Sequence, residues 1–141
     1  MVAATCAPGG RLPARAPGPG EVRLRVRRAG ICGSDLHHDL HGHVGRFVPT
    51  RPFVLGREFA GEVEALGTGV PARLLCARVA VDPSIPCRAC DLCRGGRPNL
   101  CPAMRFYGSA SCEPHLDGGL SGTVLVPAAN CHPIALPMTY A

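Results

Sequence analysis

Residues 87–101 read CRACDLCRGGRPNLC and contain four cysteines in the spacing C-x2-C-x2-C-x7-C: Cys87, Cys90, Cys93 and Cys101. The two-residue gaps let successive thiolates face one centre, and the longer return through residues 94–96 closes a tetrahedron. Four sulfur ligands with no open position are typical of a structural zinc site, not of a catalytic one. Two alternatives stay open: free surface thiols, and an iron–sulfur cluster, which Pro102 after the last cysteine favours and the long final gap disfavours.

The composition around this stretch indicates a small protein built from short strands and many turns. The chain has 141 residues, with 18 Gly, 15 Pro, four Phe, two Tyr and no Trp. This length predicts one domain, residues 1–141, with the cysteine stretch as a lobe within it. No run of 18 apolar residues and no export signal is present, so we expect no membrane partner and a cytoplasmic, reducing location. In that location nine cysteines favour metal binding or free thiols over disulfides.

The positive charge of the chain does not indicate nucleic-acid binding. The formal net charge is +5, and all 15 basic residues are arginines spread from Arg11 to Arg105. A nucleic-acid surface needs a concentrated basic patch with aromatic stacking partners, and six aromatic residues are too few for one. We therefore expect no nucleic-acid partner.

Four segments have the pattern of half-buried strands. Residues 21–26, EVRLRV, alternate strictly between aliphatic residues and arginine or glutamate, and residues 61–66, 77–82 and 123–128 are similar. We expect a loose leading strand within residues 1–20, a loop over 31–58 and a polar glycine-rich segment over 105–119. Short strands separated by turn signals predict a mainly β class, an all-β barrel or sandwich.

One short pattern imitates a dinucleotide-binding motif. Residues 67–72, GTGVPA, fit G-x-G-x-x-A and follow a predicted strand. The motif requires a helix next, whose N-terminus holds the pyrophosphate. Instead Pro71 leads into the apolar, strand-like RLLCARVAV. The pattern therefore predicts a turn between strands.

The best candidate for chemistry lies in residues 30–37, GICGSDLH. Cys32, Ser34, Asp35 and His37 place a thiol, a hydroxyl, a carboxylate and an imidazole within six residues. These groups suit a thiolate metal ligand with a proton relay beside it. For Ser34 and Asp35 an ordinary capping turn is the alternative interpretation.

Taken together, these motifs resemble the zinc-containing medium-chain alcohol and polyol dehydrogenases, from about Gly18 to the C-terminus. The resemblance rests on residues 17–37, PGPGEVRLRVRRAGICGSDLH, on residues 51–70, RPFVLGREFAGEVEALGTGV, and on the cysteine stretch. Residues 104–110, MRFYGSA, are similar to the L-idonate 5-dehydrogenase branch, with sorbitol dehydrogenase a close cousin. The resemblance implies a GroES-like β-barrel from which the four-cysteine structural-zinc lobe, 87–101, protrudes.

The resemblance also implies roles for individual residues. Cys32 would be a catalytic-zinc ligand, with Glu58 at or beside the metal and Asp35 orienting a ligand. Ser34 would donate to the substrate oxygen and His37 would pass the proton to solvent. The implied reaction is the NAD(P)-dependent oxidation of a secondary alcohol of a polyol or sugar acid to a ketone, and a homo-oligomer stays open for full-length relatives.

The sequence departs from the family pattern in two ways that bear on the catalytic metal site and on cofactor binding. Arg57 stands where the family has its histidine ligand, and arginine is permanently protonated and offers no lone pair to a metal. The family's remaining protein ligand and its Rossmann domain would follow the last residue of this chain. We expect Arg57 to point toward Cys32 and Asp35 and to pair with the carboxylates of Asp35 and Glu58. Smaller departures fall at residues 76–79 and 118–123.

Two functional hypotheses follow from the sequence. The first is the N-terminal catalytic domain of a zinc-dependent dehydrogenase. The second is a zinc-stabilised β-barrel, a truncated relative with no catalysis of its own, to which NAD(P) matters only if the missing domain is present. A third idea, a separate metal site of His37, His38, His41 and His43, is disfavoured because this spacing converges on one point in neither a helix nor a strand.

Overall fold

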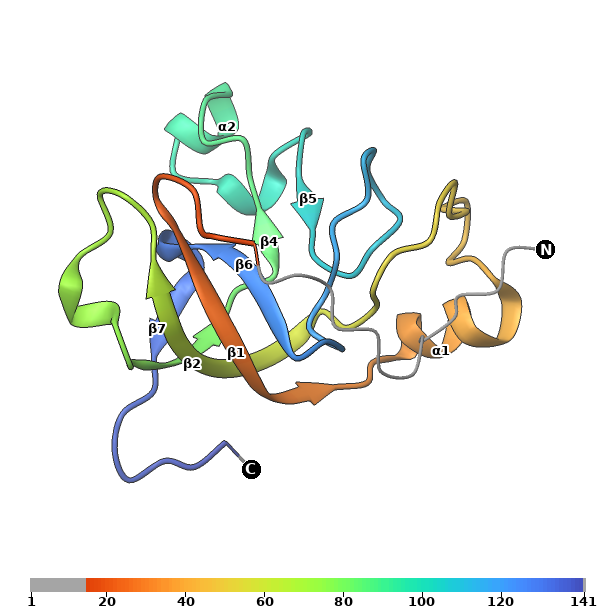
Figure 1. Ribbon diagram of the computed structural model, residues 1–141. Helices are drawn as coiled ribbons and strands as arrows, with labels where there is room; N and C mark the ends of the chain where they lie inside the picture. Colours follow the sequence, from red (N-terminus) through yellow and green to blue (C-terminus); the bar gives the residue numbers. More distant parts are fainter. Residues whose placement is uncertain (1–14, 141) are drawn as a thin grey trace.

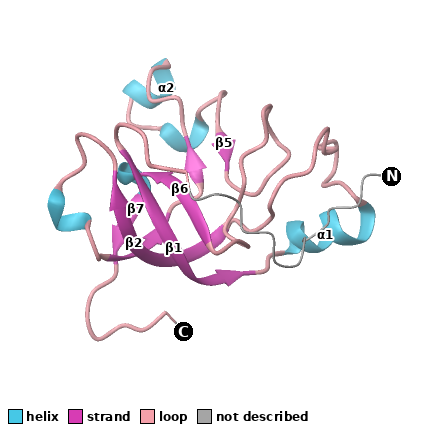
Figure 2. Ribbon diagram, in the orientation of Figure 1, coloured by secondary structure: helices cyan, strands magenta, loops and turns pink. Residues whose placement is uncertain are grey.

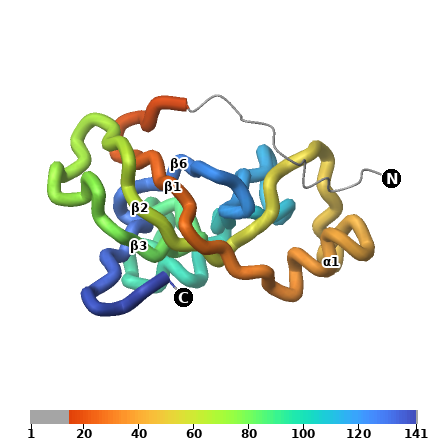
Figure 3. Tube along the Cα trace, turned by 60° about the horizontal axis from the view of Figure 1, so that its bottom comes forward, coloured from red at the N-terminus to blue at the C-terminus, as the bar shows by residue number. Residues whose placement is uncertain are grey.

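A computed structural model of the chain describes residues 15–140 (Figure 1). Five strands form one antiparallel sheet in the order β6-β1-β2-β3-β7. Their bounds are β1 Glu21–Gly30, β2 Glu58–Leu66, β3 Arg78–Val81, β6 Thr123–Pro127 and β7 Cys131–Pro133. A second, two-stranded sheet pairs β4, Ser84–Ile85, with β5, Arg105–Phe106. The sheet is strongly curved, and the bending of its strands β1 and β2 is visible in Figures 1 and 3.

The helices are short and lie outside the sheet, as the colours of Figure 2 show. They are α1, Gly33–His41, and α2, Asp91–Arg94, with 3-10 turns η1, Ala72–Leu74, η2, Pro98–Leu100, and η3, Ala128–Asn130. Within residues 15–140 no helix is long and apolar enough to cross a bilayer. The predicted mainly β class is confirmed.

The hydrophobic core lies on the inner face of the sheet. Its fully buried side chains come from alternate positions of four strands: Val22, Leu24, Val63, Val79 and Val126. Burying each such side chain contributes about 1.5–3 kcal/mol. Phe59 and Tyr107 complete the core with an edge-to-face contact of 6.0 Å between ring centroids.

The outer face of the β1–β2 pair carries the charges that the alternating sequence predicted. Arg23 and Arg25 of β1 both bind Glu64 of β2, at 2.7 and 2.9 Å. Because side chains alternate along a strand, this ion-pair group lies opposite the buried Val22 and Leu24.

The four predicted strands are present, although their ends differ. The segment predicted over 21–26 extends to Gly30, and the one predicted over 61–66 begins at Glu58, because the two strands pair along nearly their whole length. The turn predicted at 67–72 is confirmed, and its last residue begins the 3-10 turn η1. The expected strand-like run after Pro71 begins later than predicted, because residues 72–76 are 3-10 helix and turn and β3 starts at Arg78.

Other expectations about secondary structure were wrong. The expected loop over 31–58 contains helix α1, which begins after Cys32 and ends at Gly42, whose φ of 74° is the left-handed value of a helix end. Residues 15–20 form no strand, and residues 1–14, where the rest of the expected leading strand falls, lie outside the described residues. Strands β4, β5 and β7 were not predicted because each has only two or three residues.

A close crossing of backbone segments positions the start of β2 against the first turn of α1. Gly118 lies so close to Gly56 that a Cβ on Gly118 would come within 2.2 Å of the Gly56 carbonyl oxygen. Gly56 itself has a φ of 96°, a backbone conformation that residues with a side chain rarely adopt. This crossing holds the residue after Gly56, which is Arg57, against the first turn of α1.

Candidate functional site

The four cysteines predicted to bind a metal converge in the lobe that carries α2, which projects away from the sheet in Figure 1. Their sulfur atoms all lie within 4.8 Å of one another, and those of Cys87 and Cys93 are 4.0 Å apart. A tetrahedral zinc with bonds of about 2.3 Å requires sulfur–sulfur distances of about 3.8 Å. Among the described residues this is the one group of three or more potential ligands that converges. The residues present therefore fit a zinc ion.

The backbone of the lobe favours a thiolate at Cys87. Backbone N–H groups donate to the sulfurs, from Cys90 to Cys87 and from Cys87 to Cys101, each at 3.3 Å. Hydrogen bonds from the backbone at Ala89 and Cys90 lower the pKa of Cys87 to about 6. Burial and the neighbouring sulfurs of Cys90 and Cys101 raise the pKa of Cys93 to about 12. A divalent cation at the centre would favour the thiolate form of its cysteine ligands.

The second group of predicted site residues gathers at the N-terminus of α1. The Cys32 sulfur lies 2.8 Å from the Ser34 hydroxyl oxygen, and Arg57 Nη2 donates to the same sulfur at 3.2 Å. The same Nη2 also donates to the Ser34 hydroxyl oxygen. Since Ser34 accepts from Arg57, its own hydrogen is available to the sulfur. Burial raises the pKa of Cys32, but the hydrogen bonds from Ser34 and Arg57 outweigh this and lower it overall.

Asp35 has a structural role in this arrangement. Its carboxylate accepts from the Cys32 backbone N–H at 2.9 Å and from the Gly56 backbone N–H at 3.1 Å, and the residue is only 4% exposed. The first bond caps α1, and the second ties α1 to the segment leading into β2. The capping interpretation of Asp35 therefore describes its contacts.

The Arg57 side chain points toward Cys32 as predicted, but the predicted carboxylate partners were wrong. Arg57 does point toward Cys32, but it forms no ion pair with Asp35 or Glu58, all three of which lie in the described part of the chain. Asp35 is occupied by backbone donors, and Glu58 is exposed beside Gly30, its partner across the β1–β2 ladder. The guanidinium binds the sulfur and the hydroxyl instead.

A catalytic zinc does not fit at Cys32. Such a site needs three protein ligands and an open position. Here the sulfur already accepts from a permanent cation, and Cys32 belongs to no converging group of three or more potential ligands in the described residues. Glu58 is exposed on a groove that Arg28, Gly30 and Arg57 also line. A dication on the Cys32 sulfur would lie against the positive charge of Arg57.

Of the histidines, the predicted His37 lies away from the site and the unpredicted His38 lies in it. His37 is exposed, and its ring contact is with His41, at 5.4 Å between centroids. His38, one helical turn after Ser34, is 3% exposed and packs edge-on against Phe53. Burial, helped by the nearby Arg57, holds the pKa of His38 below its usual range although Asp35 acts to raise it. Within the described residues, the four histidines considered as a separate metal site do not converge as a group of possible ligands.

His38, Ser34 and Arg57 line a cavity of about 230 Å³ between α1 and the segment after β5. Sequence reasoning missed His38 because the loop expected over 31–58 gave no reason to count one turn from Ser34. A helix assignment would have supplied that signal, since residues four apart share a helix face.

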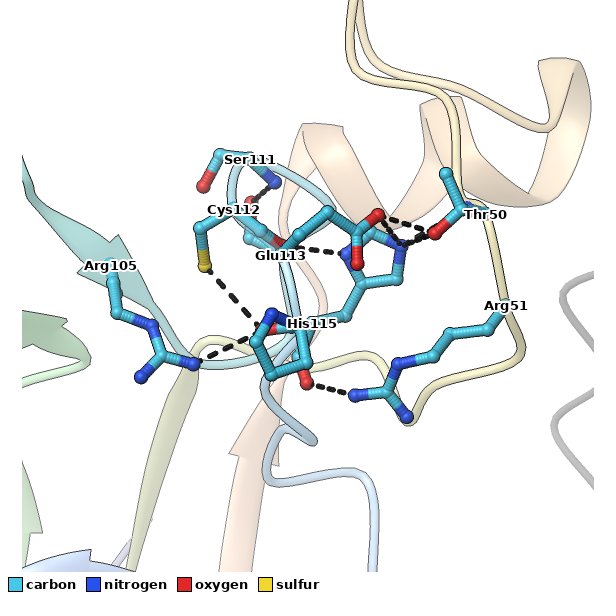
Figure 4. Close-up of polar contacts among 9 residues, drawn as sticks. Thr50, Arg51, Arg105, Ser111, Cys112, Glu113 and His115 are labelled. Atoms are coloured by element: carbon cyan, nitrogen blue, oxygen red, sulfur yellow. Dashed lines mark hydrogen bonds and ion pairs between the residues drawn. The ribbon is translucent and has the colours of Figure 1, made fainter.

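His115 joins the two loops beside this cavity (Figure 4). Its ring is buried, with Nε2 accepting from the Thr50 backbone N–H at 3.1 Å and Nδ1 lying 2.8 Å from the Cys112 carbonyl oxygen. The carbonyl acceptor places the ring hydrogen on Nδ1, so Nε2 is free to accept. Glu113 and Arg51 add contacts between the same loops. The segment 109–115, which includes the cavity residue Ser111, is thereby held in place.

Comparison with known proteins agrees with the geometry. Residues 18–136 match the family described as "Alcohol dehydrogenase GroES-like domain". The chain is 40% identical over 114 residues to an L-idonate 5-dehydrogenase of Vitis vinifera, and 44% identical over 98 residues to a sorbitol dehydrogenase of Bacillus subtilis. These matches cover 81% and 70% of this chain, but 30% and 27% of those proteins.

A solved structure shows the same fold. The crystal structure of L-idonate 5-dehydrogenase from Escherichia coli superimposes with a TM-score of 0.76 and 38% identity, over 83% of this chain and 33% of that one. The chain thus spans about a third of the length of the relatives that it matches.

Proposed function

The chain belongs to the alcohol dehydrogenase GroES-like domain family, and on that premise we propose that it is a zinc-stabilised substrate-side domain related to polyol and sugar-acid dehydrogenases, in which Arg57 occupies the place of the catalytic zinc. The single observation that carries this proposal is the contact of 3.2 Å between Arg57 Nη2 and the Cys32 sulfur. This contact supports the hypothesis that residues 15–140 are a zinc-stabilised β-barrel with no catalysis of its own.

The structural zinc belongs to the lobe. Cys87, Cys90, Cys93 and Cys101 would hold it with four thiolates, which leaves no open coordination position for substrate. When bound, the metal would supply folding free energy rather than Lewis-acid chemistry. Its neighbouring backbone donors, described above, keep the sulfurs in place.

The remaining site residues hold the α1 end of the domain together. Ser34 links the Arg57 guanidinium to the Cys32 sulfur, and Asp35 links α1 to the backbone at Gly56. No proton relay through His37 follows from this arrangement, because His37 lies on the exposed side of α1. Hydride transfer to NAD(P) would need a further binding unit, since the glycine pattern at 67–72 is a turn within the described residues.

The other hypothesis, a catalytic domain that oxidises a polyol, is favoured by the similarity to L-idonate 5-dehydrogenase and sorbitol dehydrogenase. An assay of the purified, zinc-loaded chain with L-idonate or sorbitol and NAD or NADP separates the two. We expect no turnover above the protein-free rate and about one zinc per chain by metal analysis. Sustained NAD(P)-dependent oxidation, or two zinc ions per chain, would establish the catalytic hypothesis instead.

A further inference from the structure

Two segments, residues 44–54 and residues 109–118, both contribute to the lining of the cavity beside α1. They are connected at two places. At one place the Gly118 backbone N–H donates to the Val54 carbonyl oxygen at 2.8 Å. At the other place the buried ring of His115 connects them. The first connection is made by backbone atoms, whereas the second depends on a side chain that can change its charge.

His115 Nε2 lies between a hydrogen-bond donor and a hydrogen-bond acceptor, as Figure 4 shows. The Thr50 backbone N–H donates to it at 3.1 Å, and the Glu113 carboxylate oxygen Oε1 lies 3.3 Å away. Because Nδ1 carries the ring hydrogen toward the Cys112 carbonyl oxygen, Nε2 can accept from Thr50 only while the ring is neutral. Once Nε2 carries a proton it can only donate, and the carboxylate is then its charge-assisted partner.

Two cations and a thiol lie around the same group. Arg51 donates to the His115 carbonyl oxygen, and Arg105 of β5 donates to the carbonyl oxygen of the preceding residue at 3.0 Å. The Cys112 thiol lies 3.9 Å from that second oxygen. Among the described residues, Glu113 is the only carboxylate in ion-pair contact with the ring. The two guanidinium groups repel a positive charge on the ring and Glu113 attracts it, so a proton on Nε2 is directed toward Glu113.

A second imidazole faces His115 from α1. The Phe53 ring lies between the two, with its centroid 5.5 Å from that of His38 and 5.2 Å from that of His115. Burial holds the pKa of His38 below its usual range, so His38 is neutral near pH 7. On the far side of His38, Asp35 and Arg57 act on its pKa in opposite directions. The charge that reaches the connection between the segments is therefore the one on His115 itself.

We propose that His115 is a pH-sensitive connection between the two segments: when Nε2 takes up a proton, it stops accepting from the Thr50 N–H and donates to the Glu113 carboxylate instead. At neutral pH both connections hold the segments against the cavity. In acid the Gly118 connection remains, and the segment that carries Thr50 is held less firmly. The inference goes beyond the proposed function and does not rest on it, since it requires neither zinc in the lobe nor any catalysis.

Amide exchange with water, measured by NMR on the zinc-loaded chain, tests this connection. Rates at about pH 7.5 and about pH 5.5, which span the range where histidine side chains change charge, are divided by the intrinsic rates at the same pH. The resulting protection factor of the Thr50 amide should fall by about threefold or more in acid, as expected for losing one hydrogen bond, while that of the Gly118 amide changes little. Unchanged protection at Thr50, or an equal fall at both amides, would overturn the proposal.

His115→Gln removes the titrating group and keeps its hydrogen bonds. A glutamine amide can accept from the Thr50 N–H and donate to the Cys112 carbonyl oxygen, and it takes up no proton in this range. We expect the Thr50 protection factor of this variant to be the same at both pH values. His132→Gln, at an exposed position of β7, is the matched control and should show the fall seen in the parent. A fall of the parent's size in His115→Gln would mean that another group titrates, and would refute the proposal.

Glu113→Gln keeps the test decisive if His115→Gln folds poorly. It leaves the ring in place and removes the carboxylate to which the protonated ring donates. The midpoint of the change at Thr50 should move to lower pH by about half a unit or more, because a nearby opposite charge favours the charged form. Glu62→Gln removes the same charge from β2, where the carboxylate pairs with Arg27, and should leave the midpoint unchanged. Equal midpoints in Glu113→Gln and the parent would contradict the exchange of partners.

Discussion

Arg57 determines which groups the site beside α1 can bind. It follows Gly56, whose backbone conformation and close crossing with Gly118 are fixed, and it lies against the first turn of α1. A histidine at this position would present a lone pair to a metal near the Cys32 sulfur, whereas the guanidinium presents only donors. Arginine at this position therefore supplies a positive charge in place of a metal ligand. Its guanidinium donates hydrogen bonds to the Cys32 sulfur and to the Ser34 hydroxyl oxygen.

We predict that Arg57→His creates a weak second zinc site. The positive charge beside Cys32 would be lost at neutral pH and one imidazole ligand would be gained. Zinc titration monitored by metal analysis should give more than one zinc per chain at high zinc concentration, with the second binding weakly because a third ligand is lacking. Arg73→His, on the exposed turn η1, is the control and should stay at one. Identical stoichiometry in both variants would mean that Arg57 does not block the site.

At the scale of single elements, the strands could be predicted and the helix could not. The segment 21–26 alternates between core and solvent, and the structure buries Val22 and Leu24 as that period requires. Helix α1 buries only Asp35 and His38, which are polar, so its sequence lacks the repeating apolar positions that predict a helix. Its start depends on a hydrogen bond from the Cys32 backbone to Asp35, and its position depends on Gly56. Contacts between residues far apart in sequence leave no trace in a local pattern.

The ion-pair group on β1 and β2 makes stability depend on pH. Partial burial acts to raise the pKa of Glu64, but the adjacent Arg23 and Arg25 outweigh this and lower it. A carboxyl group whose folded pKa is lowered stabilises the protein above its unfolded pKa of about 4.3, and this contribution is lost as the pH falls through the folded pKa.

Glu64→Gln should therefore be less stable than the parent at pH 7, by up to about 1 kcal/mol, because the pair is near the surface. The difference should shrink below about pH 4. Denaturant unfolding of both proteins over this range measures it, and any loss of zinc in acid affects the two alike. A difference that does not change with pH would show that charge is not involved.

The backbone crossing at Gly118 gives a prediction with a built-in control. Gly118→Ala would place its Cβ 2.2 Å from the Gly56 carbonyl oxygen, so the crossing must open. We expect a loss of about 1–3 kcal/mol in the free energy of unfolding, as for other overpacked sites. Gly122→Ala, four residues later, meets nothing within 4 Å and should change stability little. Equal melting temperatures for both variants would show that the crossing is not tight.

For the molecule as a whole, the cysteine spacing and the strand pattern predicted the architecture, because both are local. The convergence of four sulfurs follows from a stretch of 15 residues whose ends are tied together. The site at the N-terminus of α1 joins Cys32 to Arg57, which are separated by a helix and a loop. The family resemblance named its residues, but the hydrogen-bond partners of those residues could not be predicted from the sequence. His38 and Ser111 became visible only when the cavity between their segments was seen.

The lobe and the sheet should respond differently to metal removal. None of the residues 87–100 belongs to the hydrophobic core, so the lobe has little apolar burial of its own. A chelator should therefore speed amide hydrogen exchange in the lobe well before it affects β1 and β2. Simultaneous loss of protection in the lobe and in the sheet would mean that the metal supports the whole fold cooperatively.

We propose that this chain holds one structural zinc and no catalytic zinc. Zinc X-ray absorption on the fully loaded protein tests it most directly, because it reports the ligands of every bound zinc. We expect a single shell of four sulfur atoms at about 2.3 Å. A nitrogen or oxygen component at about 2.0–2.1 Å, which would arise from zinc bound near Cys32 and Glu58 or among the histidines, would contradict it.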